Sequence, residues 1–194
     1  PQEDADRQFS ISKEIFNLPI EEKLKYRAEL EKGGCNGCKP IQSQAINSGI
    51  VTHDPAFDKT EIYNIPKFIP AFERLQPEIV NKSRPIIECF ERHIHHEIVR
   101  NLRILLAIIL ELPDDYFLSV HCYEKKSDCH LRYMKITAEP KTRTRKLPVF
   151  PSKGHTDFGS LTLLFRQPVA ASLRCRFALQ KASGSGSSRT REAI

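Results

Sequence analysis

His155 and Asp157 are separated by one residue, in the run Lys153-Gly-His-Thr-Asp-Phe-Gly-Ser160. On an extended segment, side chains two residues apart point to the same face, so one imidazole and one carboxylate could reach a single ion. These are two of the three ligands in the 2-His-1-carboxylate triad that holds Fe(II) with positions open for oxygen. The spacing therefore predicts a metal pair, although His-x-Asp also occurs as an ordinary loop pair.

The residues around this pair resemble a known family. Gly-His-Thr-Asp-x-Gly followed by Leu161-Thr-Leu-Leu164 is similar to the iron-binding motif of the isopenicillin-N-synthase-like Fe(II)/2-oxoglutarate-dependent dioxygenases. Five upstream segments follow in the family's order: Gln8-Phe9, Phe16-Asn-Leu-Pro-Ile-Glu-Glu-Lys23, the turn from Gly34 to Pro40, Glu61-Ile-Tyr-Asn64 and Leu131-Arg-Tyr133. The resemblance covers residues 1 to about 169.

The resemblance implies an oxidoreductase that uses Fe(II) and 2-oxoglutarate to oxidise a small organic molecule. His155 and Asp157 would be iron ligands, with no catalytic residue assigned beyond them. The implied fold is α+β: N-terminal helices followed by an incomplete double-stranded β-helix, or jelly roll, an architecture of about eight strands. We expect a helical region at 1–113, the first part of the jelly roll at 114–170 and a divergent tail without regular structure at 171–194.

Several departures from the family pattern favour an alternative. The family has a second iron-binding His several strands later and then an Arg-x-Ser pair for the co-substrate, but no His follows His155 in this chain. Ile136 stands where a co-substrate-contacting Tyr is expected, and the match stops after Ala170. The alternative is a catalytically incomplete fragment or remnant, truncated at both ends. His121 or His130 could replace the third ligand, and their spacing selects neither.

Two other groups of possible ligands have simpler explanations. His93, His95 and His96 lie in a helical pattern, where His93 and Glu97 could chelate a metal but one polar helix face also accounts for them. Cys35-Asn-Gly-Cys38 has the spacing of a zinc or redox pair, yet no second such pair follows. We expect neither group to bind metal.

Helices and strands that would position the motif are indicated by hydrophobic periodicity. Helical spacing predicts a helix at 3–18, ended by Pro19, and a long helical region at 77–112, interrupted near Pro85 and closed by Pro113. Apolar patterning predicts strands at 129–136 and 160–165, with an exposed loop at 137–152 and another long loop at 33–60. The sequence thus predicts helices first and strands second.

Composition restricts the class of protein. With 194 residues, 40% hydrophobic and 28% charged, the chain matches one globular domain. The apolar block at 104–110 is far shorter than the ~20 residues that span a bilayer, so we expect no membrane insertion. Six cysteines without an N-terminal apolar signal segment favour a reducing compartment, the cytoplasm.

The net charge of +6 comes almost entirely from the end of the chain. Residues 1–165 contain 24 basic and 23 acidic side chains, whereas residues 166–194 contain 6 and 1. The basic tail is rich in Ser and Gly and offers no aromatic platform for stacking bases. We therefore expect a small-molecule substrate and no nucleic-acid partner, and the sequence gives no oligomeric state.

Overall fold

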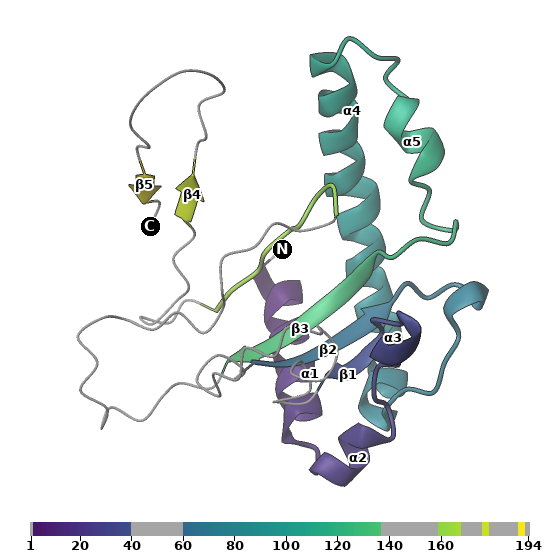
Figure 1. Cartoon of the computed structure of the whole chain (residues 1–194), viewed down its shortest axis with the longest axis vertical. Helices are drawn as coiled ribbons and strands as arrows, with labels where there is room; N and C mark the ends of the chain where they lie inside the picture. Colours follow the sequence, from purple (N-terminus) through teal and green to yellow (C-terminus); the bar gives the residue numbers. More distant parts are fainter. Residues whose placement is uncertain (1, 40–59, 137–158, 168–175, 179–189, 193–194) are drawn as a thin grey trace. The chain divides into compact units, whose positions relative to one another are not determined.

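The computed structural model describes residues 2–39, 60–136, 159–167, 176–178 and 190–192 (Figure 1). The chain divides into two compact units, residues 1–161 and 162–194. No helix in the described ranges is both long and apolar enough to cross a membrane.

The first unit begins with helix α1 (Gln2–Asn17) and the short helix α2 (Ile20–Leu24). The buried residues Ala5, Gln8, Ile11 and Ile15 recur at intervals of three and four, so they form one face of α1. Pro19 precedes α2, as is common where a helix starts. The helix predicted at 3–18 is confirmed.

A three-stranded antiparallel sheet in the order β1-β2-β3 lies beside these helices. Its strands are β1 (Gly37–Lys39), β2 (Thr60–Pro66) and β3 (His130–Ile136), and a 3₁₀ turn, η1 (Leu30–Lys32), precedes β1. The strand predicted at 129–136 is therefore confirmed. The described strands give a mixed helix-and-strand chain with an open sheet.

The prediction that helices come first and strands second is wrong, because β1 and β2 precede the long helix. Buried and exposed residues do not alternate along β2, because every residue from Glu61 to Pro66 is buried. A strand that is buried on both faces lacks the period-two pattern from which strands are recognised.

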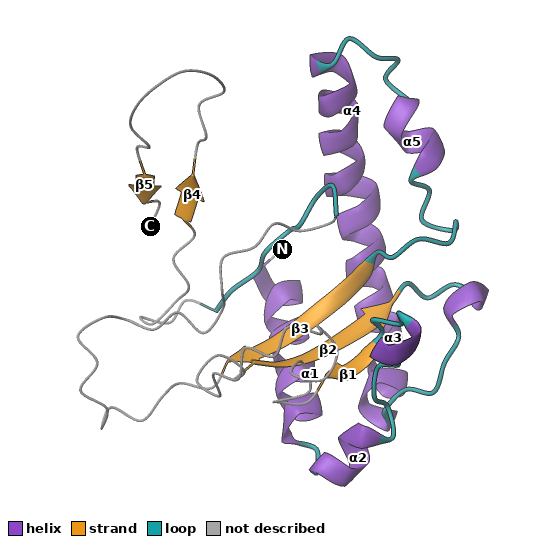
Figure 2. Cartoon of the chain, in the orientation of Figure 1, coloured by secondary structure: helices purple, strands orange, loops and turns teal. Residues whose placement is uncertain are grey.

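The hydrophobic core lies between one face of the sheet and helices α1 and α3 (Figure 2). Tyr63 pairs with Cys38 on one side and with Tyr133 on the other, and all three are buried in this cluster. Ile11, Ile15 and Phe16 from α1, Val80 and Ile87 from α3, and Tyr26 and Ile65 complete it.

A long helical stretch follows the 3₁₀ turn η3 (Pro70–Phe72). It consists of α3 (Glu78–His93), the π-helix η4 (Ile94–Val99) and α4 (Arg100–Ile109) without a gap, and α5 (Tyr116–Val120) comes after a turn. The predicted interruption near Pro85 is wrong, because Pro85 lies within α3. The irregularity is instead the π-helix, a form found mostly in short pieces and often at functional sites.

The second unit contains a two-stranded antiparallel sheet, β4 (Arg176–Ala178) and β5 (Thr190–Glu192). Both strands fall in the 171–194 segment, for which the sequence predicts no regular structure.

Candidate functional site

His155 and Asp157 lie in the 137–158 segment, outside the described residues. The residues that follow the motif, 159–167, are described, and no strand is assigned to them. The strand predicted at 160–165 is therefore wrong. An apolar run forms a strand only when a neighbouring strand pairs with it, and here Leu164 and Phe165 remain exposed.

The upstream candidate His130 lies at the start of β3 in a row of polar side chains across the sheet. Asn64, which is fully buried on β2, donates from Nδ2 to the carbonyl oxygen of Cys35 at 2.7 Å. Arg132 donates from Nε to Oδ1 of Asn64 at 2.9 Å, and its Nη2 lies 3.1 Å from Nε2 of His130. Asn64, Arg132 and His130 thus form a hydrogen-bonded row on the face of the sheet that points away from the core.

Both ring nitrogens of His130 have partners. Nδ1 lies 2.8 Å from the carbonyl oxygen of Asp128, which can only accept, so Nδ1 carries the proton and Nε2 accepts from Arg132. Burial lowers the pKa of His130, and the charges of Arg132 and Lys39 lower it further. The imidazole is neutral, as a metal ligand must be, but Arg132 occupies its only lone pair.

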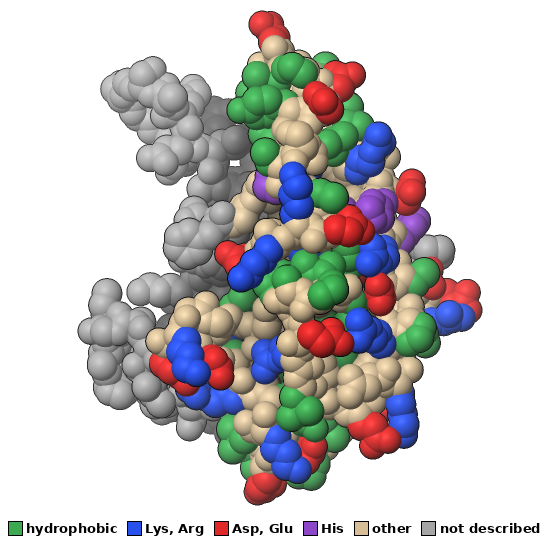
Figure 3. Space-filling model, turned by 90° about the vertical axis from the view of Figure 1, so that its right-hand side faces the viewer, with side chains coloured by type: hydrophobic (Ala, Val, Ile, Leu, Met, Phe, Trp, Pro, Cys, Tyr) green, Lys and Arg blue, Asp and Glu red, His purple; other side chains and the backbone are tan. Residues whose placement is uncertain are grey.

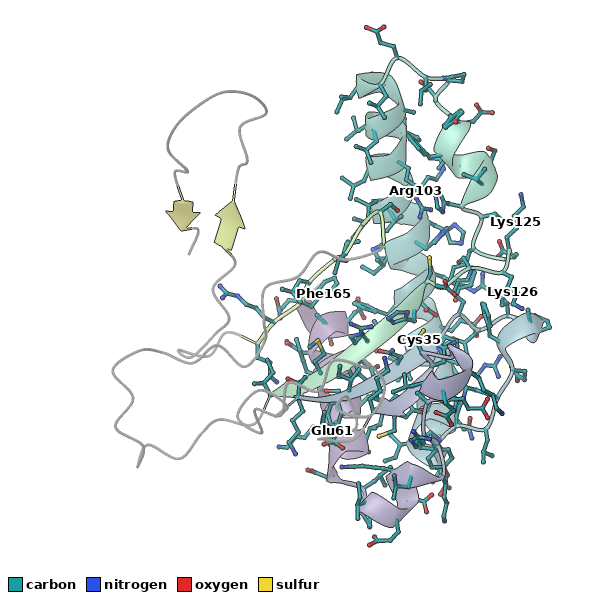
Figure 4. The ribbon with its side chains drawn as sticks, in the orientation of Figure 1. Cys35, Glu61, Arg103, Lys125, Lys126 and Phe165 are labelled. Carbon is teal, nitrogen blue, oxygen red and sulfur yellow. The ribbon has the colours of Figure 1, made fainter. Side chains whose placement is uncertain are left out.

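His121, the second upstream candidate, follows the end of α5. Its carbonyl oxygen accepts a hydrogen bond of 3.1 Å from Nη1 of Arg103, a buried side chain on α4 (Figure 4). Burial lowers the pKa of His121, and the Arg103 charge adds to the shift. His121 and Arg103 together attach the segment after α5 to α4.

His95 and His96 lie on the π-helix, beside the buried ring of Tyr123. The His95 ring meets Tyr123 edge to face at 5.3 Å between centroids, and the Arg92 guanidinium lies 4.2 Å from the Tyr123 centroid. The Tyr123 hydroxyl donates to Oε2 of Glu91 at 2.8 Å. We call Glu91, Arg92, His95 and Tyr123, together with Lys67, the Tyr123 cluster.

Electrostatics in the Tyr123 cluster are dominated by desolvation. Burial raises the pKa of Glu91 to about 7, and Glu88 adds to the shift, although Tyr123, Lys67 and Arg92 oppose it. Burial also lowers the pKa of Lys67, whose ammonium group donates to the carbonyl oxygen of Lys125. The cluster therefore contains a carboxyl group that titrates near neutral pH.

Sequence reasoning missed Glu91, Lys67 and Tyr123. Glu91 follows Ile87 by four residues and so falls beside the buried stripe of α3, where a carboxylate is unexpected. That position is a signal that could have identified Glu91. Nothing in the sequence singles out Lys67 or Tyr123, because their contacts come from distant segments.

The two other groups of possible ligands, the helical histidines and the Cys35/Cys38 pair, form no metal site in the described part of the chain. No three His, Cys, Asp or Glu side chains within that part are placed to hold one ion. Cys38 is buried in the core, and burial raises the pKa of its thiol to about 11, which makes it a poor ligand or nucleophile.

Comparison with known proteins finds a relative in a yeast, Schizosaccharomyces pombe. No family model matches the chain, and no solved structure matches it. Over 173 residues, or 88% of the chain, it is 30% identical to UPF0676 protein C1494.01 of Schizosaccharomyces pombe, whose name states no activity. The match covers 50% of that protein, so the chain spans about half the length of its relative. In sequence, the chain is similar to one half of a UPF0676 protein.

Proposed function

We propose that the chain is part of a non-haem Fe(II)- and 2-oxoglutarate-dependent dioxygenase that oxidises a small organic molecule. One observation carries the proposal: the run Gly154-His155-Thr156-Asp157, which leads into Leu161-Thr-Leu-Leu164. Most of the upstream segments that resemble the family lie in α1–α2, in β2 and in β3. A jelly roll built onto these strands is part of the same proposal.

The donor set of the motif suits Fe(II), which accepts imidazole nitrogen and carboxylate oxygen. His155 and Asp157 would supply two ligands. Among the described residues, Nε2 of His130 accepts from Arg132, and no three His, Cys, Asp or Glu side chains are placed to hold one ion. When bound, iron and 2-oxoglutarate would supply the oxidising chemistry.

A second candidate is a remnant that binds metal weakly and does not turn over. It is favoured by the contacts of His130, because its Nε2 accepts from Arg132 and is not free to act as a third ligand. This proposal applies to the chain as it stands, whereas the oxygenase proposal applies to the whole protein. Both assign iron to His155 and Asp157.

The test measures succinate formed from 2-oxoglutarate with added Fe(II), and Fe(II) affinity by anaerobic titration calorimetry. His155→Ala and Asp157→Ala are compared with His93→Ala, at an exposed helical histidine. Succinate that disappears in the first two variants and persists in the third supports the oxygenase. Fe(II) binding that depends on His155 without any succinate supports the remnant. Succinate and Fe(II) binding that are unaffected by His155→Ala and Asp157→Ala would contradict both.

A further inference from the structure

The face of the sheet that points away from the core carries two basic side chains, Lys39 on β1 and Arg132 on β3. In the ladder, Asn64 of β2 pairs with Gly37 on one side and with Arg132 on the other. Lys39 follows Gly37 by two residues, and alternate residues of a strand share a face, so Lys39 lies on the face of Arg132. Neighbouring strands are about 4.8 Å apart, and both side chains are long enough to reach one small molecule between them.

Hydrogen bonds hold Arg132 in place and leave part of its guanidinium group unused. Nε donates to Oδ1 of the buried Asn64, and Nη2 lies 3.1 Å from Nε2 of His130. Nη1 has no partner among the described residues, and the Arg132 side chain is exposed. A guanidinium group that is already positioned and still has donors is suited to an anionic ligand, because little side-chain freedom is lost on binding.

The positive charge of Lys39 and Arg132 is not neutralised within the described part of the chain. Space-filling Figure 3 shows basic and acidic side chains interspersed over the face in view, and Arg92, for example, pairs with Glu88 at 2.9 Å. Lys39 and Arg132, in contrast, form no ion pair with a described carboxylate. Burial lowers the pKa of Lys39, and the charge of Arg132 lowers it further, so the two cations repel each other. An anion bound between them would offset this repulsion.

An exposed apolar side chain adjoins the two cations. Met134 follows Arg132 by two residues on the same face of β3, and 47% of Met134 is exposed. A molecule whose anionic group contacts Arg132 and Lys39 therefore places its remaining atoms beside Met134. A planar carboxylate accepts two parallel hydrogen bonds from a guanidinium group, which fits the free end of Arg132.

We propose that Lys39 and Arg132 bind the carboxylate group of a small organic acid whose apolar body lies along Met134. This site goes beyond the dioxygenase proposal, because binding of the acid needs neither iron nor 2-oxoglutarate. If the chain is part of that oxygenase, the acid is its substrate, and this assignment of the substrate class rests on the proposed function.

Ligand-observed NMR titration of the full chain, without iron or 2-oxoglutarate, tests the site. The probe is phenylacetate, an organic acid with an apolar body, and its matched control is the uncharged phenylacetamide. We expect phenylacetate to bind and phenylacetamide not to bind. Arg132→Gln and Lys39→Gln should each weaken phenylacetate binding by about tenfold, because each removes one charge-assisted contact. Arg100→Gln and Lys13→Gln, at exposed basic side chains on α4 and α1, should leave it unchanged.

Circular dichroism verifies that each variant is folded. If Arg132→Gln does not fold, Lys39→Gln still decides, because the Lys39 side chain has no hydrogen-bond partner within the described ranges that its loss would leave unpaired. A parent chain that does not bind phenylacetate, equal binding of the two probes, or binding that survives Lys39→Gln overturns the proposal. Tighter binding of inorganic phosphate or of 2-oxoglutarate, lost in the same variants, overturns the assignment to an organic acid with an apolar body.

The binding test and the succinate assay can fail separately. Succinate formation by a chain that does not bind phenylacetate contradicts the carboxylate site and leaves the oxygenase standing. Phenylacetate binding that depends on Lys39 and Arg132, in a chain that forms no succinate, supports the site and contradicts only its role in an oxygenase.

Discussion

The hydroxyl group of Tyr133 on β3 donates a hydrogen bond of 2.7 Å to Oε1 of Gln8 on α1. The two residues are 125 positions apart, and both are buried. The bond therefore fixes the first helix of the chain to the last strand of its three-stranded sheet. Nε2 of the same Gln8 is buried and has no partner among the described residues, so Tyr133 is the main polar anchor of this side chain.

We expect Tyr133→Phe to lower the free energy of unfolding by about 1–2 kcal/mol, because it leaves Oε1 of Gln8 buried without a donor. Urea denaturation followed by circular dichroism measures the change. Tyr116→Phe is the control, since the Tyr116 side chain is half exposed and should lose little. Equal losses in the two variants would show that the buried bond contributes nothing specific.

Lys23 and Glu61 form a buried ion pair between α2 and β2. Nζ of Lys23 lies 2.8 Å from Oε1 of Glu61, and the two side chains are only 10% and 7% exposed. Lys23→Met leaves a buried carboxylate without its cation, and we expect a loss of about 3 kcal/mol in the free energy of unfolding. The same denaturation measurement applies.

The control for this ion pair is Lys82→Met, which breaks an i,i+4 pair with Glu78 whose side chains are 74% and 77% exposed. Exposed pairs contribute little, so this change should stay within about 0.5 kcal/mol. A loss in Lys23→Met no larger than that in Lys82→Met would contradict the role given to the buried pair.

The structure also predicts an effect of pH through Glu91. Burial raises the pKa of this carboxyl group from its ordinary value near 4.5 to about 7, so the folded chain holds a proton that the unfolded chain releases between those pH values. The free energy of unfolding should fall as the pH rises through this window. Glu91→Gln removes the titrating group and retains an oxygen that can accept from Tyr123.

Urea denaturation at pH 5.5 and at pH 7.5 gives the change in the free energy of unfolding between the two pH values. The contribution of Glu91 is the difference between this change in the parent chain and in Glu91→Gln. His95 acts in the opposite direction, because burial lowers its pKa, but it is present in both chains and cancels. Glu111→Gln, at an exposed carboxylate, should follow the parent chain. A Glu91→Gln variant with the parent's pH dependence would show that Glu91 does not titrate in this range.

How far the sequence predicts this fold depends on the element. The boundaries of α1 and β3 follow from patterns in which one face is buried and the other is not. The sequence does not predict β2, because this strand is buried on both faces and its side chains do not alternate between polar and apolar. It does not predict the π-helix either, because that local change in backbone hydrogen bonding does not alter the hydrophobic spacing recognisably. Pro85 misleads, because proline usually interrupts a helix and here it lies inside one.

Some residues of the candidate sites could be recognised in the sequence and others could not. His155 and Asp157 are recognisable because their spacing and neighbours form a local motif. The position of Glu91 beside the buried stripe of α3 is a local signal, but the Tyr123 cluster as a whole could not be recognised, since Lys67, Glu91 and Tyr123 meet only through folding. Local motifs can be found in a sequence, whereas contacts between distant segments depend on the packing of the helices and the sheet.

The last prediction concerns the third metal ligand. If His130 served as that ligand, its Nε2 would have to release Arg132 and then face the positive guanidinium group at close range. Both requirements disfavour metal binding, so His130→Ala should leave the Fe(II) affinity of the chain within about twofold, as measured by anaerobic titration calorimetry. Asp157→Ala should weaken the same affinity at least tenfold, because the carboxylate supplies the negative charge that a divalent ion requires. A further variant, Arg132→Gln, removes the positive charge beside Nε2 of His130. If Arg132→Gln raises the Fe(II) affinity, and adding His130→Ala abolishes that increase, then Arg132 prevents His130 from binding the metal in the parent chain. A parent affinity that falls tenfold in His130→Ala would instead place His130 in the iron site with His155 and Asp157.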